Sequence, residues 1–157
     1  QDIITELNYL VMSNAEGQHF ITFFVAIYDT SSKRLKYVNS GHNPPILIRD
    51  ENEYELLKEG STVLGAFEEL PFLNVGIIED LEKFVLCAFT DGLTEIHNNK
   101  NEEFGSHALY EVVKKHLTDS PSEMNEAIIE TMKVFKGENS YMDDITLFTC
   151  SYDSNAE

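Results

Sequence analysis

The stretch KFVLCAFTDGLTE at residues 83–95 contains the strongest strand signal in the chain and ends in an acidic turn. Residues 83–90 are mostly apolar, β-branched or aromatic, which is typical of a strand buried in a sheet. Asp91 and Gly92 follow directly where this strand is expected to end. The sequence therefore predicts a buried strand that carries a carboxylate to one edge of a sheet.

A second strand near the C-terminus has its acidic residues at the opposite end. Asp143 and Asp144 directly precede ITLFTCSY at 145–152. If the two strands are antiparallel neighbours, Asp91 and Asp143 share a sheet edge, with their Cα atoms about 5 Å apart. Carboxylates at that range repel unless a cation lies between them, and oxygen ligands suit Mg²⁺ or Mn²⁺. Turn-forming aspartates at strand ends are the competing and commoner explanation.

The remaining segments predict a single α+β domain of mostly antiparallel strands with helices covering a face. Helices are expected over 2–14 (Ile3, Leu7, Leu10 and Val11 on one face, ending at Asn14 and Gly17), 107–117, and from a Ser120–Glu123 capping box to about Phe135. Other strands are expected over 20–28, 35–40, 45–50, 54–59 and 74–78, with hairpin turns at 30–33 and 50–53. Residues 60–74 show no clear period and predict a long connection, and 153–157 predict a disordered tail.

Composition restricts the class of protein further. The chain has 157 residues and a net charge of −17, so its surface does not suit nucleic acid or anionic lipid. An acidic surface suits divalent cations or a basic protein partner. No apolar run approaches the roughly 20 residues that a membrane span needs. Cys87 and Cys150 lie in separate strand-like runs and are expected to be free thiols, which favours a cytoplasmic protein.

Patterns for other catalytic chemistries are weak. The five histidines show no metalloprotease-type spacing, so a zinc site is not expected. No nucleophile elbow and no glycine-rich phosphate loop is visible in the sequence. No catalytic side chain is therefore predicted beyond candidate metal ligands and the water they would activate.

Four motifs occur together in the order found in one known family. They are YVNSGHNPP at 37–45, FTDGLTE at 89–95, FG at 104–105 and DDITL at 143–147. The chain resembles the metal-dependent protein phosphatases of the PPM, or type 2C-like, family, in the bacterial SpoIIE/RsbU branch. The resemblance implies an α/β-sandwich of antiparallel sheets flanked by helices, with a dinuclear Mn²⁺ or Mg²⁺ site. It also implies that Asp91 and Asp143 are metal ligands, while Gly92 and Asp144 support the site.

One departure from the family pattern concerns the beginning of its catalytic domain. The family's domain starts with strands that carry further metal-binding aspartates, one of them in a D-x-S-G-H-G-type motif. The SGH at 40–42 only looks like that motif, because Val38 occupies the position of the acidic residue. We therefore expect residues 1–152 to be the C-terminal portion of a phosphatase domain whose N-terminal strands are missing. Such a fragment should be inactive by itself and should self-associate, as a homodimer, through open strand edges.

The resemblance implies a protein serine/threonine phosphatase. A metal-activated water would hydrolyse phosphoserine or phosphothreonine on a regulatory protein of the STAS, or anti-anti-sigma, type. A sensor domain upstream in a parent chain is the expected source of regulation. The alternative is a non-catalytic, phosphatase-like interaction module in a signalling switch, which missing upstream aspartates would favour.

Overall fold

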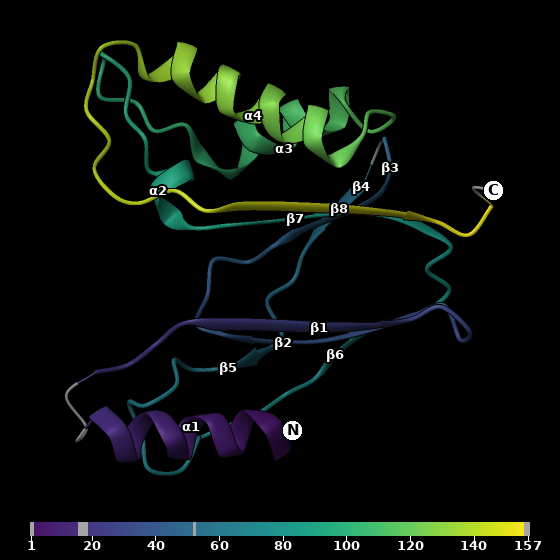
Figure 1. The fold of residues 1–157 in the computed structure, drawn as a ribbon, viewed down its shortest axis with the longest axis vertical. Coiled ribbons are helices and arrows are strands. Elements are labelled where there is room, and N and C mark those ends of the chain that lie inside the picture. The colour runs from purple at the N-terminus through teal and green to yellow at the C-terminus, as the bar shows by residue number, and fades with distance from the viewer. Residues whose placement is uncertain (1, 16–18, 52, 156–157) are drawn as a thin grey trace. The chain divides into compact units, whose positions relative to one another are not determined.

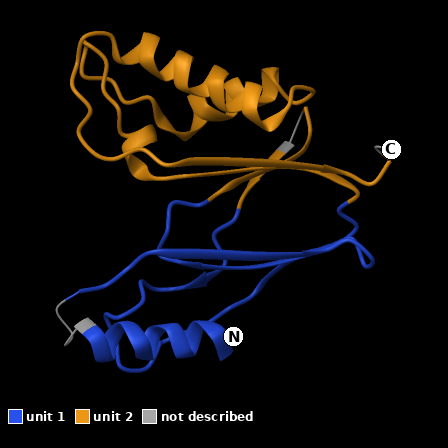
Figure 2. Cartoon of the chain, in the orientation of Figure 1, with its two compact units in different colours: residues 1–44, 57–81 blue, residues 45–56, 82–157 orange. Residues whose placement is uncertain are grey.

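A computed structural model describes residues 2–15, 19–51 and 53–155. The chain forms two compact units, shown in Figure 2. Unit 1 comprises Gln1–Pro44 and Leu57–Leu81, and unit 2 comprises Pro45–Leu56 and Glu82–Glu157. Both units combine helices with mainly antiparallel sheets, which confirms the predicted α+β class.

Unit 1 is built around strand β2 (Figure 1). Its elements are α1 (Asp2–Ala15), β1 (Phe23–Asp29), β2 (Arg34–Ser40), β5 (Gly60–Ser61) and β6 (Gly76–Ile78). Strand β2 pairs antiparallel with β1 and β6 and parallel with β5. The β1–β2 hairpin matches the predicted one, and its turn is held by the Asp29 carboxylate, which accepts hydrogen bonds from the amides of Ser31 and Ser32.

The buried face of helix α1 overlaps the predicted one but is shifted from it, because the predicted residues Leu7 and Val11 are half-buried while the other two are exposed. Ile4 and Asn8 are each 2% exposed, whereas Ile3 and Leu10, both predicted to be buried, are 63% and 46% exposed. The side-chain amide of Asn8 donates to the carbonyl of Phe67 at 3.0 Å, and its side-chain oxygen accepts from the backbone amide of Gly65 at 2.9 Å. Since these bonds satisfy a buried polar side chain, the helix is turned by about one residue relative to its most apolar stripe.

The long connection predicted over 60–74 contains a strand that the sequence did not indicate. Strand β5 is two residues long, and Gly60 lies against the backbone of Asn39 on β2. A side chain at position 60 would overlap that backbone, so glycine permits the pairing. A two-residue strand is too short to show a period in the sequence.

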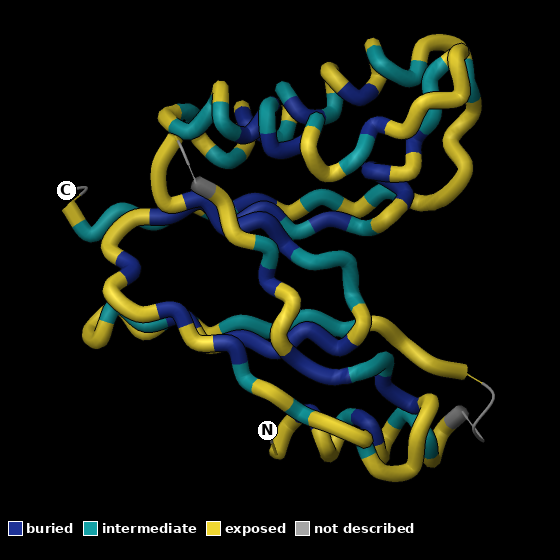
Figure 3. The backbone as a smooth tube through the Cα atoms, turned by 180° about the vertical axis from the view of Figure 1, so that it is seen from behind, coloured by how far each residue is buried: buried dark blue, intermediate teal, exposed yellow. Residues whose placement is uncertain are grey.

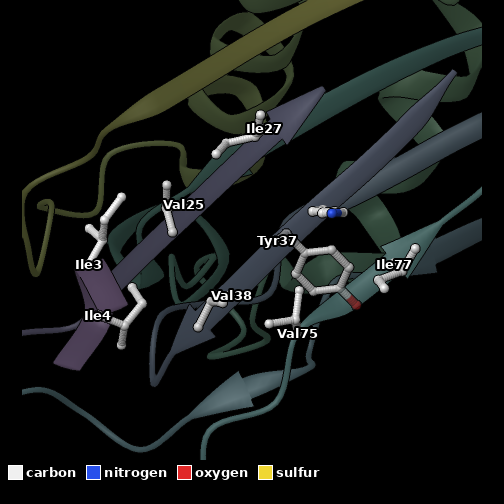
Figure 4. Close-up of a pocket in the computed structure, with 9 residues that line it drawn as sticks. Ile3, Ile4, Val25, Ile27, Tyr37, Val38, Val75 and Ile77 are labelled. Carbon is white, nitrogen blue, oxygen red and sulfur yellow. The ribbon is translucent and has the colours of Figure 1, made fainter. Parts of the chain in front are cut away.

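An apolar groove of about 400 Å³ lies in unit 1 between α1 and the sheet (Figure 4). Its lining includes residues from α1, β1, β2 and β6, among them Ile3, Val25, Ile27, Val38 and Ile77. Ile27 is 64% exposed, so α1 leaves part of this sheet face uncovered.

Unit 2 is a four-stranded antiparallel sheet with helices that pack on it (Figure 1). Its elements are β3 (Ile46–Asp50), β4 (Glu53–Leu56), β7 (Lys83–Phe89), α2 (Asp91–Thr94), α3 (Gly105–Lys115), α4 (Pro121–Lys136) and β8 (Leu147–Asp153). The strands follow the order β4-β3-β7-β8. Alternate residues of β7, including Val85, Cys87 and Phe89, pack in a core with α3 and α4.

The pattern of burial in unit 2 agrees with the packing of helices on the sheet. Buried residues concentrate along the strands and the inward faces of α3 and α4, and exposed residues lie along the outer helix surfaces (Figure 3). Helix α4 starts with the predicted capping box, in which the Ser120 hydroxyl accepts from the Glu123 amide and the Glu123 carboxylate accepts from the Ser120 amide. The capping box fixes the start of the helix that leads toward Asp143.

Several predicted boundaries move by a few residues. The strand predicted over 20–28 begins at Phe23, and the strand predicted over 145–152 begins at Leu147 and includes Asp153. Asp153 was therefore placed wrongly in the tail, and residues 156–157 of that tail lie outside the described residues. Gly17 and Asn52, which the sequence placed at a helix end and in a turn, also lie outside them. Within the described ranges, no helix is both long and apolar enough to cross a membrane.

Candidate metal site

The predicted neighbours, strands β7 and β8, do pair antiparallel in unit 2. Their register runs from Lys83 opposite Asp153 to Phe89 opposite Leu147. One further backbone bond, from the Thr90 amide to the Thr146 carbonyl at 3.0 Å, extends the pairing beyond the ladder. The end of β7 and the start of β8 therefore meet at one sheet edge, as the strand positions predicted.

Asp91 and Asp143 come to this edge by a route that differs from direct cross-strand pairing. The β7–β8 register, continued past Phe89, places Ile145 opposite Asp91. Asp91 instead begins the short helix α2, and Gly92 in its first turn packs against the backbone of Asp144 and of Asp143. The α2 turn, and not the strand ladder, brings the two acidic segments together.

Gly92 has a steric role at this approach. A Cβ built on Gly92 would overlap the carbonyl oxygen of Asp144 and lie 3.3 Å from the carbonyl carbon of Asp143. The φ of Gly92 is not in the left-handed region, so its backbone conformation does not require glycine. The reason for glycine at this position is the close approach of two backbones.

Thr90 is the residue that the sequence reasoning missed. Its hydroxyl donates to the Asp144 carbonyl at 3.1 Å and accepts from the Thr146 amide at 2.9 Å. One side chain thus links the last residue before α2 to both sides of Ile145. A hydroxyl residue directly before Asp91 was the available signal, but its partners lie more than fifty positions away.

The two candidate ligands have similar local hydrogen bonds. The Asp91 carboxylate accepts from the Gly92 amide at 3.0 Å, and the Asp143 carboxylate accepts from the Asp144 amide at 2.7 Å. These bonds orient the side chains, and both residues are exposed. Since a carboxylate has about four acceptor positions, each can bind a cation as well. Asp144 supports Asp143 through its backbone amide, while its own side chain is exposed.

The donor set fits a hard divalent cation in its chemistry but supplies only part of a coordination sphere. Exposed aspartate oxygens are the ligands that Mg²⁺ and Mn²⁺ prefer. Across residues 2–15, 19–51 and 53–155, no group of three or more His, Cys, Asp or Glu side chains is arranged to hold one ion. Asp91 and Asp143 can therefore contribute ligands to a site that needs further oxygen donors.

A pocket of about 360 Å³ lies beside the acidic edge. Its lining combines the two carboxylate residues Asp143 and Asp144 with the apolar residues Ile129, Met132, Tyr141 and Ile145. Helix α4 supplies Ile129 and Met132, so the same helix that precedes Asp143 also shapes the space next to it. A group held at Asp143 would have an apolar surface next to it.

Comparisons with solved structures place the fold in a class. The structure resembles the SiaA-PP2C domain of Pseudomonas aeruginosa, with a TM-score of 0.83 and 19% identity over 96% of this chain and 60% of that one. It also resembles the manganese-presoaked phosphatase domain of the cell fate determinant SpoIIE from Bacillus subtilis, with a TM-score of 0.66 and 15% identity over 100% of this chain and 76% of that one. The fold is therefore that of PP2C-type phosphatase domains.

The sequence comparisons name the family. The model of the stage II sporulation protein E (SpoIIE) family matches residues 1–153, and the chain belongs to that family. Its relatives include the phosphoserine phosphatase RsbP of Bacillus subtilis, which is 27% identical over 144 residues. That alignment covers 92% of this chain and 34% of RsbP, so the chain spans about a third of this relative.

Proposed function

We propose that the chain is the C-terminal portion of a protein serine/threonine phosphatase domain, in which Asp91 and Asp143 bind divalent cations. The supporting observation is that the α2 turn holding Asp91 packs against the backbone of Asp143 and Asp144 at one edge of the unit 2 sheet. Membership of the SpoIIE family and the name of the relative RsbP support the reaction class. Divalent cations, Mn²⁺ or Mg²⁺ as a dinuclear pair, would supply an activated water and neutralise charge on the phosphoryl group.

The chain's own residues have distinct tasks in this proposal. Asp91 and Asp143 supply anionic oxygen ligands, oriented by the amides of the residues that follow them. Thr90 and Gly92 keep the two ligand segments in contact, the first by hydrogen bonds and the second by leaving room. Asp144 supports the site through its backbone.

The proposed substrate is a phosphoserine or phosphothreonine on a regulatory protein of the STAS, or anti-anti-sigma, type. The resemblance to the SpoIIE/RsbU branch supports this class. The net charge of −17 adds a physical argument, because it favours a partner with a basic surface around the phosphorylated residue.

Substituting the two ligands in a protein that carries this chain within a complete phosphatase domain tests the proposal. Asp91→Asn and Asp143→Asn should each abolish Mn²⁺-dependent hydrolysis of p-nitrophenyl phosphate, since each removes a charged oxygen while keeping the side-chain volume. Thermal stability without metal should stay the same or rise, because carboxylate repulsion is relieved. Glu126→Gln, at an exposed carboxylate on α4, is the matched control and should keep full activity. Full activity in either aspartate variant would reject the ligand assignment.

A further inference from the structure

Lys136, the last residue of α4, organises the segment that leads to Asp143. Its ammonium group donates to the carbonyl of Gly137 at 3.0 Å and to the carbonyl of Asn139. The same group lies 4.8 Å from the centre of the Tyr141 ring, within the range of a cation–π interaction. One side chain therefore contacts three positions of the short link between α4 and Asp143.

The same link is joined to the segment that follows Asp91. The Asn139 side-chain amide donates to the carbonyl of His97 at 2.9 Å. His97 lies in a loop that is closed by its own backbone bonds, including the one from Phe104 to Ile96 at 2.8 Å. Because this loop begins where α2 ends, Asn139 connects the two ligand-bearing segments at a second place, away from Thr90 and Gly92.

These contacts distinguish Lys136 from an ordinary lysine at a helix end. A cation in the last turn of a helix is favoured by the unpaired carbonyls there. This general effect applies equally to Lys133, which also lies in the last turn of α4. Lys133 is exposed, whereas Lys136 is half-buried and reaches beyond the helix to Asn139 and Tyr141. Its contacts lie on the link to Asp143 and not on the helix alone.

We infer that Lys136 is a positioning residue for the metal site: it holds residues 137–141 in one conformation and so places the Asp143 carboxylate beside the α2 turn. This inference rests on the proposed function only in taking Asp143 as a ligand. The ordering of the link by Lys136 is independent of any metal. The two parts can therefore be measured separately, in a protein that carries this chain within a complete phosphatase domain.

The test compares Lys136→Met with Lys136→Arg and with the matched control Lys133→Met. Methionine keeps an unbranched side chain but removes the charge and the donors, while arginine keeps both. In the metal-free chain, amide hydrogen exchange over residues 138–146 should be about tenfold faster in Lys136→Met, because the link opens locally. Exchange should return toward the original rate in Lys136→Arg and stay unchanged in Lys133→Met.

Mn²⁺ binding, followed by the electron paramagnetic resonance signal of the free ion, measures the second part. Asp143→Asn defines the share of binding due to that ligand. Lys136→Met should weaken Mn²⁺ binding by up to about tenfold and toward the Asp143→Asn value, with Lys136→Arg restoring it. A general loss of structure would lower the melting temperature and speed exchange throughout the chain, so equal melting temperatures confine the effect to the link and the site.

Each result gives a decision. Unchanged exchange in Lys136→Met overturns the ordering role, and faster exchange with unchanged Mn²⁺ affinity overturns the positioning role. If Asp143→Asn itself binds Mn²⁺ like the original chain, the proposed ligand assignment fails, and the exchange rates still decide whether Lys136 orders the link.

Discussion

Gly92 and Asp144 approach so closely that a single added methyl group on Gly92 would overlap the Asp144 carbonyl oxygen. This contact joins the first turn of α2, which carries Asp91, to the backbone carbonyl of the residue that follows Asp143. The two candidate ligands are therefore brought together by backbone packing as well as by the side chain of Thr90.

Gly92→Ala should destabilise unit 2 and disturb the site. Overpacking of this kind typically costs about 1–3 kcal/mol, whereas the helix preference of alanine over glycine returns at most about 1 kcal/mol. The net effect should be a lower unfolding free energy, measured by urea denaturation, together with weaker Mn²⁺ binding.

Gly105→Ala is a useful control for the Gly92 substitution. Gly105 has a φ of 74° and no atom within 4 Å of an added Cβ, so alanine there introduces backbone strain without a clash. It should lower stability but leave Mn²⁺ binding unchanged. If Gly92→Ala binds Mn²⁺ normally, the close approach has no role in the site.

The capping box at the start of α4 predicts a pH dependence of stability. The hydroxyl and the amide of Ser120 donate to the Glu123 carboxylate and lower its pKa from the usual value of 4.5. Because the folded pKa lies below the unfolded one, this contribution is fully present above about pH 4.5 and is lost as the pH falls through the folded pKa. Glu123→Gln should keep the cap geometry but remove this titration, so its melting temperature should fall less between pH 5 and pH 3 than that of the original chain.

Ser120→Ala separates the cap from the charge. It should lose about 1 kcal/mol of stability at neutral pH, because the alanine side chain cannot accept from the Glu123 amide. It should also show a flatter acid profile, since the hydroxyl that lowers the pKa of Glu123 is gone. Identical acid profiles for all three chains would contradict the assignment.

Local signals in the sequence were sufficient for the β7–β8 pair and the α4 cap. The run of apolar residues at 83–90 and the Ser120–Glu123 spacing are contiguous, and both appear in the structure as expected. The buried face of α1 was predicted only in part, because it includes Asn8, whose partners at 65–68 lie nearly sixty positions away. Hydrophobic periodicity predicts that the most apolar face of a helix is buried, and it does not detect a polar residue that is buried with its hydrogen bonds satisfied.

In the candidate site, too, contiguous sequence was sufficient for some features, while others depend on residues far apart in the chain. The positions of Asp91 and Asp143 at strand ends indicated that they share an edge. The β7–β8 pairing confirms that the strand ends meet, and the contact of Gly92 with the backbone of Asp144 brings the two acidic segments together. The Thr90–Thr146 and Asn139–His97 links could not be predicted, because they join residues 56 and 42 positions apart through single side chains. The residues that form these links do not make a recognisable sequence motif, so only the fold shows that they are in contact.

The two cysteines are free thiols in different environments, as their separate strands predicted. Cys87 is fully buried, and burial raises its pKa to about 12. At pH 8, on the order of one molecule in ten thousand would carry the reactive thiolate at this position. Cys150→Ser, which leaves Cys87 alone, should therefore not react with a disulfide reagent at pH 8 until the chain is unfolded. Rapid labelling of this variant under native conditions would show that unit 2 opens around its core.

Strand β1 gives the last prediction, which concerns self-association. In the part of the chain that the structure describes, β1 pairs with β2 alone, and its other edge is open. Ile27 on this strand is 64% exposed and lines the apolar groove, so an open edge and an apolar face lie together. Such surfaces favour pairing with a second chain. We expect the 157-residue chain to form dimers or larger species in light scattering.

Ile27→Lys should shift this equilibrium toward the monomer, because a lysine on an edge strand must be desolvated when a second strand pairs there. Val134→Lys is the matched control, since Val134 is a β-branched residue that is 74% exposed on α4 in unit 2. It adds the same charge on a different surface and should leave the association unchanged. The comparison is made by light scattering at several protein concentrations, with circular dichroism to verify that both variants are folded. A monomeric parent chain would show that the β1 edge does not mediate assembly. Equal dissociation by the two lysine variants would show that net charge, and not the β1 edge, governs it.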